Sequence, residues 1–118
     1  SLQNIRLVTS GMLNEHPEIT ALITMREMVE TALYGAANDA GLRIPDDISV
    51  VGLKHPQGPE LTSPALTALD MPAWSMAYEA GNMLIDRLEE VDTNVKEILR
   101  EPILTVRAST SPVGRHVY

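Results

Sequence analysis

One segment near the middle of the chain carries most of the structural information, and it reads Ala40-Gly-Leu-Arg-Ile-Pro-Asp-Asp-Ile-Ser-Val-Val-Gly52. Gly41 is placed to end a helix in the left-handed conformation, and Pro45 prevents the helix from resuming. Two aspartates then favour a turn, and the apolar run over residues 48–53 is typical of a buried strand. The segment therefore predicts a helix, a turn and a strand in succession.

The same alternation extends in both directions from this segment. Towards the N-terminus, apolar spacing predicts a helix over 3–15, a strand over 20–25 covered on both faces, and a helix over 28–40. Towards the C-terminus we expect a strand over 66–71, a helix over 73–91 that accepts Pro72 at its start, and an edge or crossing strand over 98–107. Strands that alternate with helices at this spacing indicate an α/β fold with a parallel sheet flanked by helices.

Ligands of such sheets bind beyond the carboxyl ends of the strands. The residues that directly follow the first two predicted strands are Arg26-Glu27 and Lys54-His55. These four residues are therefore the candidate ligand-binding positions.

The composition narrows the class of protein. The chain has 118 residues and a formal net charge of −7, which opposes direct binding of a polyanion such as DNA. It has no Cys and no Phe, so we expect the six methionines to fill an aliphatic core. No apolar run approaches the length of a membrane span, and we expect no membrane association.

No motif in the chain predicts catalysis. The three histidines (His16, His55 and His116) lie far apart, no glycine-rich phosphate loop or nucleophile elbow occurs, and the acid pairs at 46–47 and 89–90 are read as solvated charge. We therefore expect no catalytic residue, no metal site and no cofactor.

Four motifs then point to a family. Besides residues 40–52, they are Thr20-Ala-Leu-Ile, Ser63-Pro-Ala-Leu-Thr-Ala-Leu and Leu104-Thr-Val-Arg-Ala-Ser-Thr-Ser-Pro112. Together they resemble, in order and at similar intervals, the effector-binding domain of LacI/GalR-family bacterial transcriptional repressors. The resemblance covers about residues 17–112 and implies a type I periplasmic-binding-protein fold, with two α/β lobes and a ligand cleft between them.

The resemblance also implies a domain organisation. Residues 1–118 correspond to the C-terminal part of that domain, with about 17–70 in the C-terminal lobe and about 72–104 in elements of the N-terminal lobe. Residues 1–118 do not include the family's helix-turn-helix DNA-binding domain. We expect that domain, and not these residues, to contact operator DNA, and we expect the protein to act in the cytoplasm. In the family the apolar stripe of residues 74–91 packs on the sheet of the N-terminal lobe, which is otherwise missing here. We therefore expect this stripe to be buried by dimerisation, by domain swapping or in a rearranged position.

The candidate ligand positions differ from those of typical sugar-responsive members. Arg26-Glu27 stand where the family carries Asn-Asp, Lys54-His55 stand near a usual Asp, and Met71 replaces a glutamine. Arg26 and Lys54 would suit an anionic effector, a sugar acid or a sugar phosphate. The alternative is that Glu27 neutralises one of these cations in an ordinary ion pair.

The family's dimer contacts come from the helix that matches 28–40 and the loop that matches 57–64. Met28, Tyr34, Gln57 and Leu61 are the corresponding candidates, although Met28 and Tyr34 could instead face the sheet. The function implied is that of an effector-sensing and dimerisation region of a repressor, which performs no chemistry. The alternative is a periplasmic sugar receptor of a transport system, which shares the fold.

Overall fold

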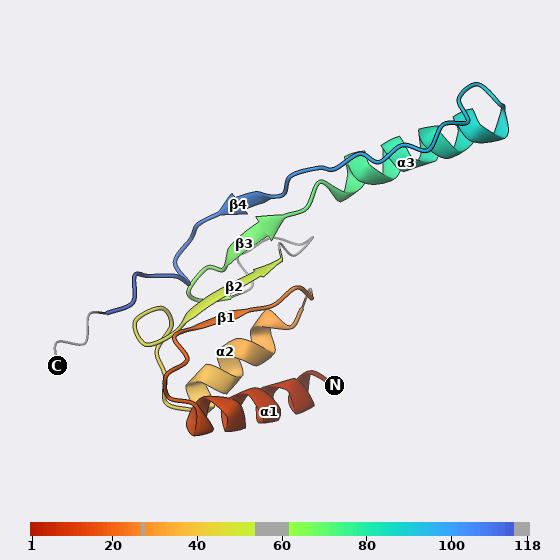
Figure 1. Ribbon diagram of the computed structural model, residues 1–118. Helices are drawn as coiled ribbons and strands as arrows, with labels where there is room; N and C mark the ends of the chain where they lie inside the picture. Colours follow the sequence, from red (N-terminus) through yellow and green to blue (C-terminus); the bar gives the residue numbers. More distant parts are fainter. Residues whose placement is uncertain (27, 54–61, 115–118) are drawn as a thin grey trace. The chain divides into compact units, whose positions relative to one another are not determined.

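The structure is a computed structural model, in which residues 1–26, 28–53 and 62–114 are described (Figure 1). Its elements, in chain order, are α1 (Leu2–Glu15), β1 (Ala21–Ile23), α2 (Glu30–Asp39), β2 (Ser49–Leu53), β3 (Thr67–Asp70), α3 (Ala73–Leu88) and β4 (Ile103–Thr105). The chain divides into two compact units: unit 1 comprises residues 1–70 and 104–118, and unit 2 comprises residues 71–103. Each unit is described separately below.

The strands form one sheet in the order β1-β2-β3-β4. β1 pairs in parallel with β2, with Ala21 opposite Ser49, and β2 pairs in parallel with β3, with Val51 opposite Thr67. The predicted α/β fold with a parallel sheet is confirmed. β4 lies at the edge beside β3, directly after Pro102, where a residue without an N–H is tolerated.

The core of unit 1 lies between the sheet and α2, which is backed by α1 (Figure 1). Its largest fully buried apolar side chains are Ile48 and Val50, and Leu33 of α2 packs against the same cluster. β1 differs from the prediction, because Leu22 is buried while Ile23 remains 70% exposed. As an edge strand with a helix on one face only, β1 buries one side of its pleat rather than two.

α2 ends as the sequence predicts. Gly41 has φ +71°, a left-handed backbone that an L side chain adopts only with strain. The Leu42 N–H donates to the Ala37 carbonyl at 2.9 Å, which satisfies one of the last carbonyls of the helix. This geometry turns the chain from α2 towards β2.

A segment close to the C-terminus passes the amino-terminal ends of β2 and β3, where the blue chain lies in Figure 1. Its hydrogen bonds hold these two strands together. Ser109 is fully buried, and its hydroxyl accepts from the Thr67 N–H at 2.7 Å and donates to the Val50 carbonyl at 2.6 Å. The Val50 N–H donates to the Ser109 carbonyl at 2.9 Å. The neighbouring Thr110 hydroxyl lies 2.9 Å from the Thr67 hydroxyl. Ser109 therefore links β2 to β3 by both its backbone and its side chain.

The expectation that methionines fill the core is wrong. The exposed methionines are Met12, Met25, Met28, Met71 and Met76, and the buried apolar positions are Leu, Ile, Val and Ala. Small residues such as Ala32, Ala36 and Ala37 on α2 let the helix approach α1 and the sheet closely. A core of this kind closes without bulky side chains.

Unit 2 consists of α3 and a non-helical chain that returns along it, and it has little core of its own. α3 contains no buried residue, although its apolar stripe predicts a buried face. Trp74, at the start of that stripe, is 79% exposed and stacks on Tyr78 with ring centroids 5.3 Å apart. Arg100 of the returning chain forms an ion pair with Glu79.

We expect Ser109→Ala to lower the free energy of unfolding by about 2–3 kcal/mol, because it leaves the buried Thr67 N–H and Val50 carbonyl without partners. Denaturant titration would measure the loss. Ser10→Ala is the matched control, since the Ser10 hydroxyl bonds only within its own helical turn, and it should change stability by less than about 0.5 kcal/mol. Equal losses in both variants would contradict the role of Ser109.

Acid should weaken the contact between α1 and α2. Arg6 donates to both oxygens of Asp39 at 2.6 Å, and this bond lowers the pKa of Asp39 and raises the pKa of Arg6. A lowered folded-state pKa gives stability that is present above the unfolded value, about 3.9, and lost as the pH falls below it. The stability difference between the wild type and Asp39→Asn, measured by denaturant titration, should therefore shrink below about pH 3.9. A constant difference across that range would contradict the assignment.

Candidate functional site

The candidate site lies where β1, β2 and β3 reach their carboxyl ends. We call this side of the sheet its carboxyl edge, to distinguish it from the edge strands β1 and β4. Because the three strands are parallel and in register from Ile23 to Val51 and from Leu53 to Leu69, their carboxyl ends lie at one edge. Among the described residues, those that directly follow the strands at this edge are Thr24 after β1 and Met71 after β3. Arg26 therefore projects from the same edge at which β2 ends, as the sequence predicts for parallel strands.

Thr24 fixes the turn that presents Arg26. Its N–H donates to the Val51 carbonyl at 2.9 Å and so extends the pairing of β1 and β2 by one residue. Its buried hydroxyl accepts from the Arg26 N–H and donates to the Arg26 carbonyl, each at 3.3 Å. The backbone of Arg26 is thereby tied to the sheet, while its side chain is exposed.

Gly52 leaves room for the side chains of Leu66 and Thr24, which pack over β2 at this position. A Cβ at this position would lie 3.1 Å from Leu66 Cδ2 and 3.3 Å from Thr24 Cγ2. Both distances are tighter than ordinary van der Waals contact, so a side chain here would displace Leu66 or Thr24. The glycine of the quoted segment therefore helps to place Thr24, and through it Arg26.

The third strand adds Asp70, which the sequence prediction did not select, beside Met71, which it named. β3 ends at Asp70, which brings a carboxylate to the same edge as Arg26, and Met71 follows it with 41% of its surface exposed. Asp70 lies inside the strand predicted over 66–71, so no position directly after a predicted strand pointed to it, and only the parallel register of β2 and β3 brings it to this edge. The edge thus carries charge of both signs.

Only part of the predicted set lies within the described residues. Glu27, Lys54 and His55 of the ligand positions, and Gln57 and Leu61 of the dimer positions, lie outside the described residues. Met28 is 47% exposed and has φ +69°, so the turn into α2 holds a non-glycine residue in the left-handed region. The proposed dimer role of Met28 and Tyr34 stays a prediction.

Tyr34 has a defined partner within its own chain. Its hydroxyl donates to the Pro64 carbonyl at 2.8 Å, and its ring packs partly against the core. Burial raises the pKa of Tyr34. Nearby, Glu30 in the first turn of α2 is 2% exposed, and its Oε2 has no hydrogen-bond partner.

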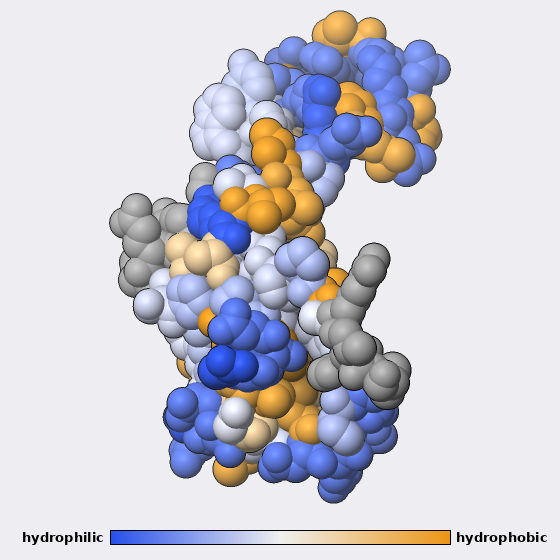
Figure 2. Space-filling model, turned by 90° about the vertical axis from the view of Figure 1, so that its left-hand side faces the viewer, coloured by the Kyte–Doolittle hydropathy of each residue, from blue (hydrophilic) through white to orange (hydrophobic). Residues whose placement is uncertain are grey.

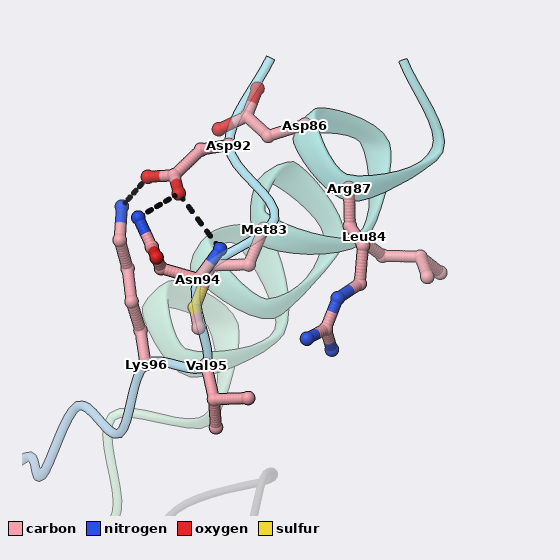
Figure 3. Close-up of a pocket in the computed structure, with 8 residues that line it drawn as sticks. All are labelled: Met83, Leu84, Asp86, Arg87, Asp92, Asn94, Val95 and Lys96. Carbon is pink, nitrogen blue, oxygen red and sulfur yellow. Dashed lines mark hydrogen bonds and ion pairs between the residues drawn. The ribbon is translucent and has the colours of Figure 1, made fainter. Parts of the chain in front are cut away.

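The hollow shown in Figure 3 lies beside the C-terminal end of α3, between this helix and the chain that returns along it. It has a volume of about 240 Å³. Asp92 inside it accepts from Lys96 and from both the backbone and side-chain nitrogens of Asn94, and the Lys96 ammonium lowers the pKa of Asp92. The polar groups that line this hollow bind one another, and these bonds stabilise the turn that follows α3. For that reason the hollow is not our candidate site.

Within residues 1–26, 28–53 and 62–114 no group of three His, Cys, Asp or Glu side chains could hold a metal ion. None of the helices in the described part of the chain has the length and apolar content needed to span a membrane.

Comparisons with known proteins agree on one family. Residues 3–110 match the family described as periplasmic binding protein-like domain. A curated relative, the HTH-type transcriptional repressor PurR of Klebsiella pneumoniae subsp. pneumoniae, is 32% identical over 100 residues, which are 85% of this chain and 29% of the relative. The chain therefore spans less than a third of the length of that relative.

Solved structures show the same fold. A LacI family transcriptional regulator from Enterococcus faecium with bound ribose has a TM-score of 0.77 at 24% identity, covering 96% of this chain and 42% of that chain. The complex of the transcriptional regulator CelR with cellobiose has a TM-score of 0.81 at 24% identity, covering 92% of this chain and 33% of that one.

We expect Thr24→Val, which keeps the shape of the side chain but removes its hydroxyl, to lower the free energy of unfolding by about 1 kcal/mol. Hydrogen exchange of the Arg26 amide should accelerate, because that N–H loses its acceptor. The control is Thr24→Ser, which retains the hydroxyl and should retain slow exchange. Unchanged exchange in Thr24→Val would show that the hydroxyl does not hold the turn.

Proposed function

The chain belongs to the periplasmic-binding-protein-like domains of LacI-family transcriptional regulators, and from that premise we propose that it binds a small carbohydrate-like effector at the carboxyl edge of its parallel sheet. The observation that carries the proposal is the convergence of β1, β2 and β3 on one edge, which brings Arg26 and Asp70 to the same side of unit 1. Ligands of parallel sheets bind at such edges.

The ligands of the similar structures support a sugar as the class of effector. Ribose is bound to the Enterococcus faecium regulator, and cellobiose is bound to CelR. A carboxylate such as that of Asp70 accepts hydrogen bonds from sugar hydroxyl groups. Asp70 is therefore proposed to contact the hydroxyl face of the effector.

The effector is proposed to carry an anionic group, as a sugar acid or a sugar phosphate does. A guanidinium binds carboxylate or phosphate through two parallel hydrogen bonds, and Arg26 stands at the edge with its backbone held by Thr24. Lys54, which follows β2, would add a second cation. Arg26 and Asp70 together then suit a ligand that has both an anionic group and hydroxyl groups.

The remaining parts of the proposal concern the longer regulator. Unit 2 would contribute to a second lobe, so that an effector bound at the edge of unit 1 changes how the two lobes close. Homodimerisation through α2, with Met28 and Tyr34 as contacts, would couple that closure to operator binding by a separate helix-turn-helix domain. Such coupling requires that the effector bind the two closure states with different affinity.

The proposal is tested by a thermal-shift screen of the protein against neutral sugars, sugar acids and sugar phosphates, because a ligand that binds only the folded state raises the melting temperature. We expect stabilisation by an anionic sugar. Stabilisation by neutral sugars alone would exclude the anionic class, and no response to any sugar would contradict the carbohydrate effector.

Arg26→Ala should then weaken binding of the responding anion by about 10- to 100-fold, the usual loss when a hydrogen bond to a charged group is removed. Calorimetric titration would measure the dissociation constant. Arg43→Ala is the matched control, because Arg43 pairs with Asp47 ahead of β2, at the opposite end of the strand. It should leave the affinity unchanged, and an unchanged affinity in Arg26→Ala would remove Arg26 from the site.

A further inference from the structure

One buried carboxylate has no partner in the described part of the chain. Hydrophilic side chains cover much of the surface drawn in Figure 2, whereas Glu30, in the first turn of α2, is 2% exposed. It is the only charged side chain among the buried residues that the structure describes. Its Oε2 accepts no hydrogen bond, and none of the ion pairs formed by the described residues includes it. Because a buried charge without a counter-charge is costly, we expect this group to have a partner that is not part of the chain described.

A second buried oxygen without a partner lies on the segment that enters β3. It is the Oγ1 atom of Thr62. Thr62 stands two residues before Pro64, whose carbonyl accepts from the Tyr34 hydroxyl at 2.8 Å. Tyr34 lies one helical turn after Glu30, so the two side chains share a face of α2. The bond from Tyr34 therefore brings the segment of Thr62 to the face of α2 that carries Glu30.

The negative charge of Glu30 acts on the hydroxyl of Tyr34. Burial raises the pKa of Tyr34, and the Glu30 carboxylate raises it further, because a nearby negative charge disfavours the phenolate. The free N–H groups at the start of α2 offset only part of the cost of burying the carboxylate. The region thus combines a negative charge with neutral hydroxyl and carbonyl oxygens.

We propose that Glu30, Thr62 and Tyr34, together with the Pro64 carbonyl, bind one monovalent metal cation, Na⁺ or K⁺, between α2 and the segment that enters β3. The inference goes beyond effector binding, because no residue of the proposed effector site takes part. Carboxylate, hydroxyl and carbonyl oxygens are the ligands of hard cations. The Tyr34 hydroxyl can donate its hydrogen to Pro64 and still offer a lone pair to the cation.

The charge of the site favours a monovalent ion. One carboxylate balances one positive charge, whereas Ca²⁺ or Mg²⁺ would leave a net positive charge buried. A water molecule alone would donate hydrogen bonds to these oxygens but would leave the carboxylate without a counter-charge. The scattered histidines and acidic residues predicted no metal site, but an alkali cation can be held mainly by neutral oxygens and does not require a cluster of such residues.

Thermal unfolding of the whole 118-residue chain in different chloride salts tests the proposal, with no effector added. NaCl or KCl should raise the melting temperature relative to choline chloride of the same ionic strength, because choline screens charge equally but is too large for a buried site. The increase should saturate and reach about 5 °C when the cation exceeds its dissociation constant tenfold. Equal melting temperatures in the three salts would overturn the proposal.

Glu30→Gln removes the charge with little change in shape, and it should abolish the difference between the salts. In choline chloride this variant should be at least as stable as the wild type, because it no longer buries a charge. Glu15→Gln is the matched control, since Glu15 is exposed on α1, and it should retain the wild-type difference. A cation-specific increase that persists in Glu30→Gln would also overturn the proposal.

Thr62→Val tests the ligand set without changing the charge. If no cation binds, the substitution only removes an unpaired buried hydroxyl and should be neutral or stabilising in every salt. If a cation binds, it loses one ligand, and half-maximal stabilisation should require roughly fivefold more Na⁺ or K⁺. An unchanged half-maximal concentration would contradict the proposed ligands.

The outcome can be separated from that of the effector screen. No sugar is present in these measurements, and neither Arg26 nor Asp70 is changed. A response to Na⁺ or K⁺ without any response to sugars would leave the cation site standing and remove the proposed effector, and the reverse result would do the opposite.

Discussion

The arrangement of the strands in unit 1 depends on two hydrogen bonds made by the buried hydroxyl of Ser109. β2 and β3 are neighbours in a parallel sheet, and at their amino-terminal ends this one side chain accepts from one strand and donates to the other. Buried backbone groups without partners are costly, so the segment that follows β4 must return to the sheet to satisfy them. A residue far along the sequence thus determines how β2 and β3 are held side by side.

The candidate site follows from that arrangement. Once β1, β2 and β3 are parallel, their carboxyl ends meet at the edge opposite to the Ser109 contact, and whatever follows each strand is gathered there. Thr24 and Gly52 refine the placement, one by bonding the Arg26 backbone and the other by leaving room for Thr24. The buried hydrogen bonds of Ser109 therefore lie at one end of the strands, and the ligand-binding residues are proposed to lie at the other.

Unit 2 has a different balance of forces. Its helix and returning chain are held together mainly by exposed ion pairs such as Arg100 with Glu79, which usually contribute little to stability in water. Its largest apolar side chains, Trp74 and Tyr78, stack on one another and remain exposed. Unit 2 therefore gains little stability from buried apolar surface, in contrast to the packed core of unit 1.

The sequence by itself determined the order of the elements, the helix end at Gly41 and the α/β class, because these depend on local periodicity and on backbone conformation. It also predicted that Arg26 follows a strand, and the structure places Arg26 where the parallel strands end. Only the tertiary structure showed the exposure of β1 and of the methionines, the contribution of Asp70 and the bridging role of Ser109. Those features depend on which strand becomes an edge and which distant groups meet, and these contacts between distant residues have no local signature in the chain.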